Sequence, residues 1–261
     1  MNSEDFPPVS PKEYIHFEKS GPLRNTCILG LHGFSSTPYE LAPLAAAIHR
    51  EGAYFYAPLL AGHGTQEEDM HAVDETLWLQ NAREAFQVLP EDRAKVVVGA
   101  SMGGLLALNL AVEFNDVKAL VLLAPALSFA PLSRAMIEVS RLPALKRRDW
   151  KKSVRGGDIA SAHGRQKNPA YTRLSHAGMG ALARLRISTM NLLSKVTCPI
   201  LLIHGNQDHT IEPEASTIVA MKTNAEYIEH HRLPESFHVL GLDVDRHEIA
   251  EITSTFLERL V

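Results

Sequence analysis

Residues 95–105 read Lys-Val-Val-Val-Gly-Ala-Ser-Met-Gly-Gly-Leu, which is an apolar run, a turn of small residues and the start of an apolar helix. A serine at such a strand-to-helix turn is held in a strained backbone conformation, with its hydroxyl above the sheet. The glycines two positions before and after it let neighbouring chain segments pass close to the turn. The sequence therefore predicts a nucleophilic serine, Ser101. A dinucleotide-binding loop is excluded because the G-x-G-x-x-G pattern is absent.

Short apolar runs alternate with amphipathic stretches on both sides of this turn. The runs lack period-two alternation, which is typical of parallel strands covered on both faces. Their order predicts an α/β fold with a mostly parallel central sheet and helices on both faces. The predicted strands span residues 26–31, 54–57, 95–98, 119–123, 200–203 and 227–233, with an outlying strand at 14–18. The predicted helices span residues 39–50, 76–89, 103–113 and 247–260.

Residues 127–192 interrupt this alternation. They are too many for a loop of a compact fold. They contain amphipathic pieces at 132–145 and 179–193 but no convincing strand. We therefore expect an α/β core formed by residues 1–126 and 193–261, with residues 127–192 inserted as a helical cap, or lid, over the carboxyl edge of the sheet.

The composition is that of an ordinary globular protein. The chain has 261 residues, a formal net charge of −4 and 45% apolar residues, which excludes disordered, collagenous and coiled-coil proteins. The mild acidity gives no reason to expect nucleic acid as a partner. Cys27 and Cys198 are too few for a disulfide scaffold or a zinc site, and both lie in apolar runs, so we expect buried thiols.

The amino terminus predicts no secretory signal. It has two acidic residues and neither the basic nor the apolar region of a signal peptide. No apolar run approaches the roughly 20 residues that span a bilayer. We therefore expect a soluble, cytoplasmic protein, of which the sequence does not determine the oligomeric state.

A serine nucleophile needs a base, and the base needs an orienting acid. In hydrolases with such a turn, both partners follow the serine along the chain. Asp208 comes soon after the predicted strand 200–203, and His238 comes after the segment 227–233. Both residues therefore map to loops at one edge of the sheet, where α/β proteins place their sites. Four other histidines are alternative candidates for the base. His209 adjoins Asp208, His230 and His231 lie in the predicted last strand, and His247 begins the last helix.

The loop after the first buried strand is the expected source of an oxyanion donor. Gly33 allows close backbone approach, and the N–H of Phe34 would point into the site. The N–H of Met102 would lie at a helix start, where it can stabilise an oxyanion. We interpret His32 as a structural residue that holds this loop rather than as the base.

These residues make the chain resemble serine hydrolases of the α/β-hydrolase fold, and among them bacterial monoacylglycerol lipases and small carboxylesterases. The resemblance implies Ser101 as nucleophile, Asp208 as acid and His238 as base, with the N–H groups of Phe34 and Met102 as the oxyanion hole. It runs almost the whole length, except in the cap, where no motif aligns. It rests on residues 32–38, 62–65, 69–70, 78, 99–104, 204–208, 236–239 and 243.

The sequence departs from that family's pattern in one place. Ala61 stands before Gly-His-Gly, where relatives often have a proline, so we expect a less rigid loop there. His63, in the same motif, either fixes a turn or lines the alcohol side of the pocket. Trp78 is predicted to belong to the core rather than to the pocket.

The implied reaction is hydrolysis of short- to medium-chain acyl esters through an acyl-enzyme, with monoacylglycerols as candidate substrates and no metal or organic cofactor. Thioester, amide or carbon–carbon cleavage could use the same groups, and a non-catalytic ligand-binding protein is the alternative from another class. Apolar cap residues either line an acyl tunnel or form the cap's own core. The candidate pocket residues are His63, Phe129, Leu132, Met136, Leu142 and Met179.

Residues 134–155 are strongly basic within this acidic chain. Eight basic and two acidic side chains give the segment a net charge of +6. One interpretation is a solvated helix face. The other is weak peripheral contact with anionic membrane surfaces or attraction of acidic acyl substrates.

Overall fold

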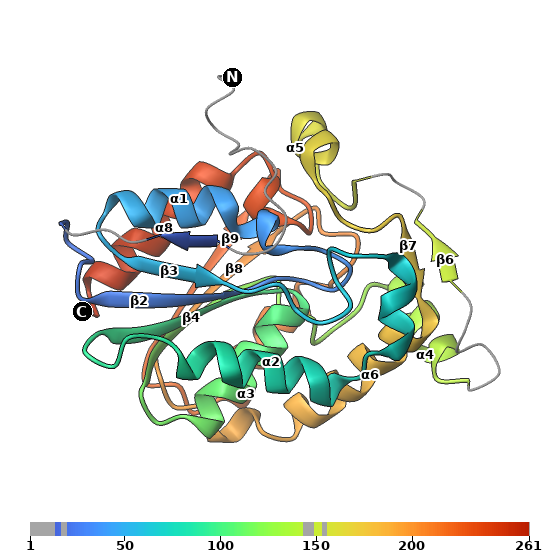
Figure 1. Cartoon of the computed structure of the whole chain (residues 1–261), viewed down its shortest axis with the longest axis horizontal. Helices are drawn as coiled ribbons and strands as arrows, with labels where there is room; N and C mark the ends of the chain where they lie inside the picture. Colours follow the sequence, from blue (N-terminus) through green and yellow to red (C-terminus); the bar gives the residue numbers. More distant parts are fainter. Residues whose placement is uncertain (1–13, 17–19, 143–148, 153–155, 261) are drawn as a thin grey trace.

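A seven-stranded sheet forms the centre of the protein in our computed structural model, which describes residues 14–16, 20–142, 149–152 and 156–260 (Figure 1). The strand order is β1-β3-β2-β4-β5-β8-β9. β1 pairs antiparallel with β3, and the other neighbours pair in parallel. The strands are β1 (Tyr14–His16), β2 (Thr26–Leu31), β3 (Tyr54–Ala57), β4 (Ala94–Ala100), β5 (Val117–Leu123), β8 (Ile200–Gly205) and β9 (Ile228–Leu233). The mostly parallel sheet confirms the predicted fold class.

Helices cover both faces of the sheet, as parallel strands require. α1 and α8 pack together on one face, and α2 and α3 pack together on the other (Figure 1). The helices of these layers are α1 (Ala42–Arg50), α2 (Glu75–Gln87), α3 (Met102–Glu113), α7 (Glu214–Lys222) and α8 (Arg246–Glu258). Short 3-10 turns occur at η2 (Pro38–Leu41), η3 (Glu67–Ala72), η5 (Leu193–Lys195) and η6 (Leu240–Leu242). The sequence analysis did not anticipate α7.

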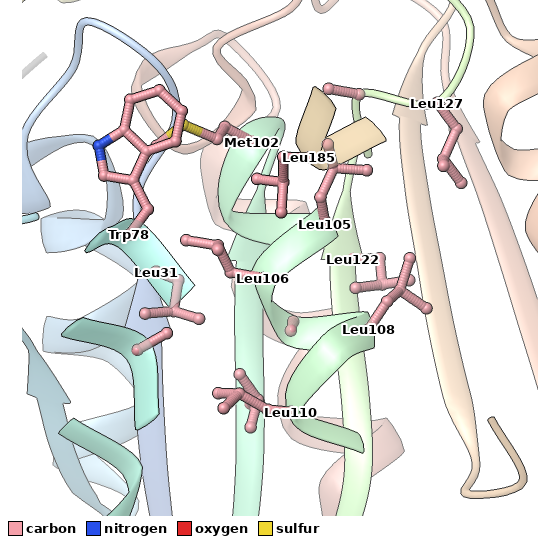
Figure 2. Close-up of a cluster of buried hydrophobic side chains, with 14 of the residues drawn as sticks. Leu31, Trp78, Met102, Leu105, Leu106, Leu108, Leu110, Leu122, Leu127 and Leu185 are labelled. Carbon is pink, nitrogen blue, oxygen red and sulfur yellow. The ribbon is translucent and has the colours of Figure 1, made fainter. Parts of the chain in front are cut away.

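The helix that follows Ser101 is buried on nearly all sides. Figure 2 shows the leucines of α3 between β4, β5 and neighbouring helices, with Trp78 and Met102 at the end nearest the turn. Trp78 is fully buried, and its indole N–H donates to the Ala61 carbonyl oxygen at 3.1 Å. Its predicted place in the core is therefore confirmed.

The segment between β5 and β8 departs from the prediction. It contains α4 (Pro131–Ser140), β6 (Asp149–Lys151), α5 (Ala162–Lys167), β7 (Arg173–Ser175) and α6 (His176–Met190). β6 and β7 pair antiparallel, so the expectation of no strand here is wrong. Strands of three residues are too short to show a hydrophobic period. α4 ends before residue 145, although residues 143–148 lie outside the described part of the chain.

These elements gather at one end of the molecule, to the right in Figure 1, and α6 packs on α2, α3 and α4.

No described helix combines the length and hydropathy of a membrane span. Within the described residues, no cluster of three or more His, Cys, Asp or Glu side chains could hold a metal ion. Cys27 is buried as predicted, whereas Cys198 is only half-buried.

Candidate active site

The backbone at Ser101 is strained, and hydrogen bonds fix both its N–H and its carbonyl group. Ser101 has φ 51° and ψ −109°, a conformation that side-chain-bearing residues rarely adopt. Its N–H donates to the Leu123 carbonyl oxygen at 2.9 Å, and its carbonyl oxygen accepts from Ala126 N–H at 3.1 Å. The end of β5 therefore holds the peptide groups of the turn and leaves the Ser101 hydroxyl to project from it.

The glycines around Ser101 are required by neighbouring backbone. A Cβ on Gly103 would collide with the Leu31 carbonyl group of β2, and one on Gly99 would collide with the Gly103 carbonyl group. The predicted close approach of chain segments at this turn is therefore confirmed.

A continuous chain of hydrogen bonds joins the three residues that the sequence singled out. The Ser101 hydroxyl lies 2.9 Å from His238 Nε2, and His238 Nδ1 lies 2.8 Å from Asp208 Oδ2. The three side chains follow β4, β9 and β8, so the carboxyl edge of the parallel sheet brings them together. The Asp208 side chain is fully buried and that of His238 is 10% exposed. With Nδ1 protonated towards Asp208, His238 Nε2 is free to accept the serine proton.

Asp208 is held as an anion. Its Oδ1 accepts backbone N–H groups of Thr210 and Ile211, both at 2.8 Å, and His204 Nε2 lies 3.3 Å from Oδ2. Burial raises the pKa of Asp208, but the charge of His238 and the hydrogen bonds from His204 and His238 outweigh it. The pKa therefore lies well below its usual value, and Asp208 is charged at neutral pH.

In His238, too, neighbouring charges outweigh burial, and here they raise the pKa. Burial lowers its pKa, but the charge and hydrogen bond of Asp208, with smaller contributions from Asp158 and Glu40, raise it above the usual 6.5. An imidazole whose cation is stabilised in this way can take the serine proton and hold it. That is the property a general base needs when it must later act as an acid.

His32 is a structural residue, as interpreted. Its Nδ1–H donates to the Gly33 carbonyl oxygen at 2.9 Å, and its Nε2 accepts from Leu60 N–H at 3.0 Å. Burial lowers the pKa of His32 to about 4. The neutral ring therefore ties the loop after β2 to the loop after β3.

The expected oxyanion donors lie on either side of Ser101. Met102 is the first residue of α3, so its N–H is one of the donors that a helix leaves without an internal partner. Gly33, which precedes Phe34, passes so close that a Cβ there would lie 3.3 Å from Ser101 Cβ. The Gly33 N–H donates to the buried Glu40 carboxylate. Glu40, which the sequence analysis missed, thus anchors the loop that carries Phe34.

The candidate pocket residues separate into two groups. Phe129 and Met179 are buried in the cluster that contains α3, and Met136 packs against it. Leu132 and Leu142 are 72% and 55% exposed, so in this structure they line no enclosed pocket. The helical period explains the difference, because α4 buries the face that carries Ile137 and Ser140 and turns Leu132 to solvent.

His63 is buried among rings. Its centroid lies 4.8 Å from that of His32, 6.1 Å from Phe34 and 5.9 Å from Trp78. Its Nδ1–H donates to the Ala61 carbonyl oxygen at 3.0 Å, which fixes the turn. Its Nε2 has no hydrogen-bond partner among the described residues. The His63 ring thus packs edge-on against the Phe34 ring, and its hydrogen bond to Ala61 favours the turn-fixing interpretation.

Hydrogen bonds restrain the loop at Ala61. The Ala61 N–H donates to Asn81 Oδ1 at 2.9 Å, which a proline could not do. Its carbonyl oxygen accepts from both Trp78 and His63. These hydrogen bonds restrain the chain where the proline ring is missing, and the lower rigidity of the loop stays a prediction.

Three bases of the basic segment have partners in the part of the chain that the structure describes. Arg134 pairs with Glu212 at 2.6 Å, and Arg141 pairs with Glu138 at 3.0 Å. Lys152 is half-buried and donates to Ser35 Oγ at 2.8 Å. The other bases apart from Lys151 lie outside the described residues; they are Lys146, Arg147, Arg148 and Arg155.

Comparisons with known proteins give a family match and two curated relatives. Residues 23–245 match the Hydrolase_4 family, described as serine aminopeptidase, S33. The chain is 31% identical over 258 residues to a thermostable monoacylglycerol lipase of Bacillus sp. (strain H-257), with 98% of each chain covered. It is 23% identical over 254 residues to a carboxylesterase of Bacillus subtilis (strain 168), covering 97% of this chain and 98% of the relative.

A solved structure supports the same fold. A structure from work on the metagenome-derived lipolytic enzymes LipS and LipT superposes with a TM-score of 0.84 at 25% identity. The superposition covers 95% of this chain and 98% of the other. The similarity therefore extends through both the sheet and the elements between β5 and β8.

Proposed function

Since the chain belongs to the Hydrolase_4 family of α/β-hydrolase fold enzymes, we propose that it is a serine carboxylic-ester hydrolase with Ser101, His238 and Asp208 as its catalytic triad. The observation that carries the proposal is the continuous hydrogen-bonded chain from the Ser101 hydroxyl through His238 to Asp208. The lipase and esterase relatives support an ester as the substrate. We infer short- to medium-chain acyl esters, including monoacylglycerols.

In the first half of the reaction, His238 Nε2 removes the Ser101 proton as Oγ attacks the acyl carbon. The carbonyl π electrons move to oxygen, and the N–H groups of Phe34 and Met102 stabilise the resulting oxyanion. Collapse of the tetrahedral intermediate breaks the bond to the alcohol oxygen, which takes the proton from His238. The acyl group is then an ester of Ser101.

In the second half, water replaces the alcohol. His238 Nε2 takes a proton from the water as its oxygen attacks the acyl carbon, and the same two N–H groups stabilise the oxyanion. Collapse breaks the bond to Ser101 Oγ, which regains its proton from His238. The buried, charged Asp208 stabilises the imidazolium in both halves and keeps its Nδ1 protonated.

We propose that residues 127–192 serve as a cap and that its apolar side chains contact the acyl chain. The ring of Phe34 supports this placement, because a Cβ on Gly178 of α6 would touch that ring. Met179, the next residue, and Phe129 and Met136 are the acyl-contact candidates. A pocket of this kind distinguishes adjacent chain lengths by only about 1–3 kcal/mol per methylene, so we expect a band of preferred lengths.

We also propose weak peripheral contact of this cap with lipid surfaces. Leu132 and Leu142 are exposed, and such apolar side chains can enter a membrane interface. Glu212 offsets the charge of Arg134, which leaves the other bases of residues 134–155 for attraction to an anionic surface. Co-sedimentation with phosphatidylserine vesicles tests this, and Leu132→Asp should reduce the bound fraction. Equal sedimentation of both proteins would contradict it.

The deciding experiment is a hydrolysis panel on wild type and Ser101→Ala. It pairs p-nitrophenyl esters of graded acyl length with matching monoacylglycerols, a thioester and aminoacyl arylamides. We expect turnover of the esters and monoacylglycerols, abolished by the substitution. A folded wild type that cleaves only amides or thioesters would overturn the ester assignment while leaving Ser101 as the nucleophile.

A further inference from the structure

Asp158 lies in the segment between β6 and α5, far in sequence from the proposed catalytic residues. It follows Gly156 and Gly157, whose φ angles of 84° and 88° favour glycine. This left-handed pair redirects the chain after β6. It brings Asp158 against two loops at the carboxyl edge of the sheet, those after β8 and β9.

The side chain of Asp158 contacts the loop that carries Asp208. Its Oδ2 accepts the His209 backbone N–H at 2.9 Å and the Thr210 hydroxyl at 3.1 Å. Its Oδ1 accepts His209 Nδ1–H at 2.9 Å. The Thr210 N–H in turn donates to Asp208 Oδ1 at 2.8 Å. The Asp158 carboxylate thus restrains His209, which follows Asp208, and Thr210, whose N–H binds Asp208.

The backbone of Asp158 contacts the loop that carries His238. Its carbonyl oxygen accepts the N–H groups of both His238 and Val239, each at 3.1 Å. The loop of the base therefore has its own main chain hydrogen-bonded to the residue whose side chain holds the loop of the acid.

We propose that Asp158 is a positioning residue for the Asp208–His238 pair, with its carboxylate holding the acid loop and its carbonyl group holding the base loop. The inference rests on the proposed function and extends it, since it assigns part of the machinery to a residue between β5 and β8. Asp158 touches neither substrate nor the reacting atoms; it acts through the two loops.

A second carboxylate, that of Asp243, also joins the segment of Asp158 to the loop of His238. Asp243 accepts the N–H groups of Ala160 and Ser161, which follow Asp158, at 3.0 and 2.8 Å. It also accepts those of Phe237, which precedes His238, and Val244, both at 2.8 Å. The segment that carries Asp158 and the loop that carries His238 are therefore bound to one buried anion. This second tether is independent of the Asp158 contacts.

The carboxylate of Asp158 also acts on His238 through its charge. The groups around His238 are Asp208, in direct contact, and Asp158 and Glu40, both of which raise its pKa. His204 adjoins Asp208, His209 adjoins Asp158, and Lys152 acts on Glu40. Loss of the Asp158 charge is therefore expected to lower the pKa of His238, whereas loss of a merely structural contact would leave it unchanged.

Asp158→Asn and Asp158→Ala separate the two effects. An asparagine oxygen can still accept from His209 N–H and Thr210, while its amide N–H can donate to His209 Nδ1, so the contacts survive without the charge. Alanine removes both charge and contacts but keeps the backbone carbonyl. Asp149→Asn is the matched control, because Asp149 also pairs with a histidine, His71, at 2.8 Å, away from the triad.

The readouts do not require the natural substrate. The first is the second-order rate of Ser101 labelling by a fluorophosphonate between pH 5 and 9, and the second is the NMR titration of the His238 ring. We expect Asp158→Asn to lower the His238 pKa and the labelling midpoint by about 0.5 pH unit, as loss of a nearby opposite charge does. We expect Asp158→Ala to lower the plateau rate about tenfold as well, a loss typical of disturbed orientation.

The opposite result is equally clear. If both Asp158 variants match Asp149→Asn in labelling rate and in the His238 titration, while thermal unfolding shows all of them folded, Asp158 does not position the pair. Asp158→Glu, which keeps the charge, should retain the wild-type pKa. Failure of the proposed function would be seen separately, as absent ester turnover by a wild type that labels normally.

Discussion

The ammonium nitrogen of Lys152 lies 2.8 Å from the hydroxyl oxygen of Ser35. Ser35 follows Phe34, has a φ of 61°, and its carbonyl oxygen accepts the Tyr171 N–H at 2.9 Å. Two residues between β5 and β8 therefore hold the loop that presents the proposed oxyanion donor. Lys152, counted in the sequence as part of a basic surface, is instead a contact within the site.

Lys152→Met is expected to change how stability depends on pH. Burial lowers the pKa of Lys152 to about 8, against the attraction of Glu40 and Glu67. Between about pH 8 and pH 10.4 the unfolded chain binds more protons at this residue, so its contribution to stability rises with pH. The methionine lacks this titration. The unfolding free energy of Lys152→Met minus that of wild type should therefore decrease as pH rises.

Urea unfolding at pH 7.5, 8.5 and 9.5 measures this difference. The slope is at most about 1.4 kcal/mol per pH unit, and less here because Lys152 is partly exposed to solvent. Lys151→Met, at an exposed neighbouring position, is the control for the loss of a lysine as such. A constant difference for Lys152→Met would contradict the assignment of a depressed pKa.

Asp208→Asn should lower activity and shift its pH dependence together. Without the anion, His238 loses the charge and hydrogen bond that raise its pKa, and the ring no longer keeps the correct tautomer. We expect kcat to fall by about 10³–10⁴-fold. The acidic limb of kcat/KM, which is set by protonation of His238, should move to lower pH. A variant with the wild-type limb would show that another group controls the base.

Gly103→Ala should destabilise the protein, because the new Cβ would collide with the Leu31 carbonyl group of β2. Overpacking of this kind costs about 1–3 kcal/mol of unfolding free energy. Gly180→Ala, within α6, is the comparison: its Cβ would lie 3.3 Å from the Ser140 carbonyl oxygen. The helix preference for alanine, about 1 kcal/mol, should offset that contact. Chemical denaturation of both variants checks the contrast, which equal stabilities would refute.

Ala61→Pro tests whether Asn81 replaces a proline. The substitution removes the Ala61 N–H that donates to Asn81 Oδ1, a bond worth about 1 kcal/mol. In an Asn81→Ala background that bond is already absent, so the proline should cost less there, or stabilise by restricting the unfolded chain. A double-mutant cycle should give a coupling of about 1 kcal/mol. Additive effects would mean that the hydrogen bond does not restrain this loop.

The parallel sheet could be predicted from the sequence because its signals are local. The bounds of β2 match its apolar run, since a strand buried on both faces shows as an uninterrupted apolar segment. Those of β3 also match its apolar run, although its residues alternate between buried and half-buried. The turn at Ser101 was recognisable for a similar reason, as the small residues that it needs adjoin the serine in sequence.

The elements between β5 and β8 were harder to predict because their stability comes from distant partners. β6 and β7 have three residues each and form only by pairing with one another. Leu132 looked like a pocket residue by composition, but its place on α4 relative to Ile137 turns it outward. Neither fact is contained in a short window of sequence.

The supporting residues of the site were missed for the same physical reason. Glu40 is an acid at a buried 3-10 turn, and its role appears only once the loop carrying Gly33 folds over it. Asp158 contributes its carbonyl group as well as its side chain, and a backbone contact leaves no signature in residue type. Sequence motifs therefore point to the proposed catalytic residues, whereas these supporting contacts depend on the folded chain.

The four backbone N–H groups gathered by Asp243 have a consequence for protein engineering. Exchange of the whole segment between β5 and β8 for that of a relative would replace Ala160 and Ser161, two of those donors, and leave Phe237 and Val244 on the recipient. The new segment of a chimaera with junctions at the two strands would have to present its own backbone N–H groups to Asp243 at the same positions, or the loop of His238 would lose this tether. Recombination libraries should instead keep residues 156–161 with the host chain and diversify the solvent-facing positions of α4, such as Leu132.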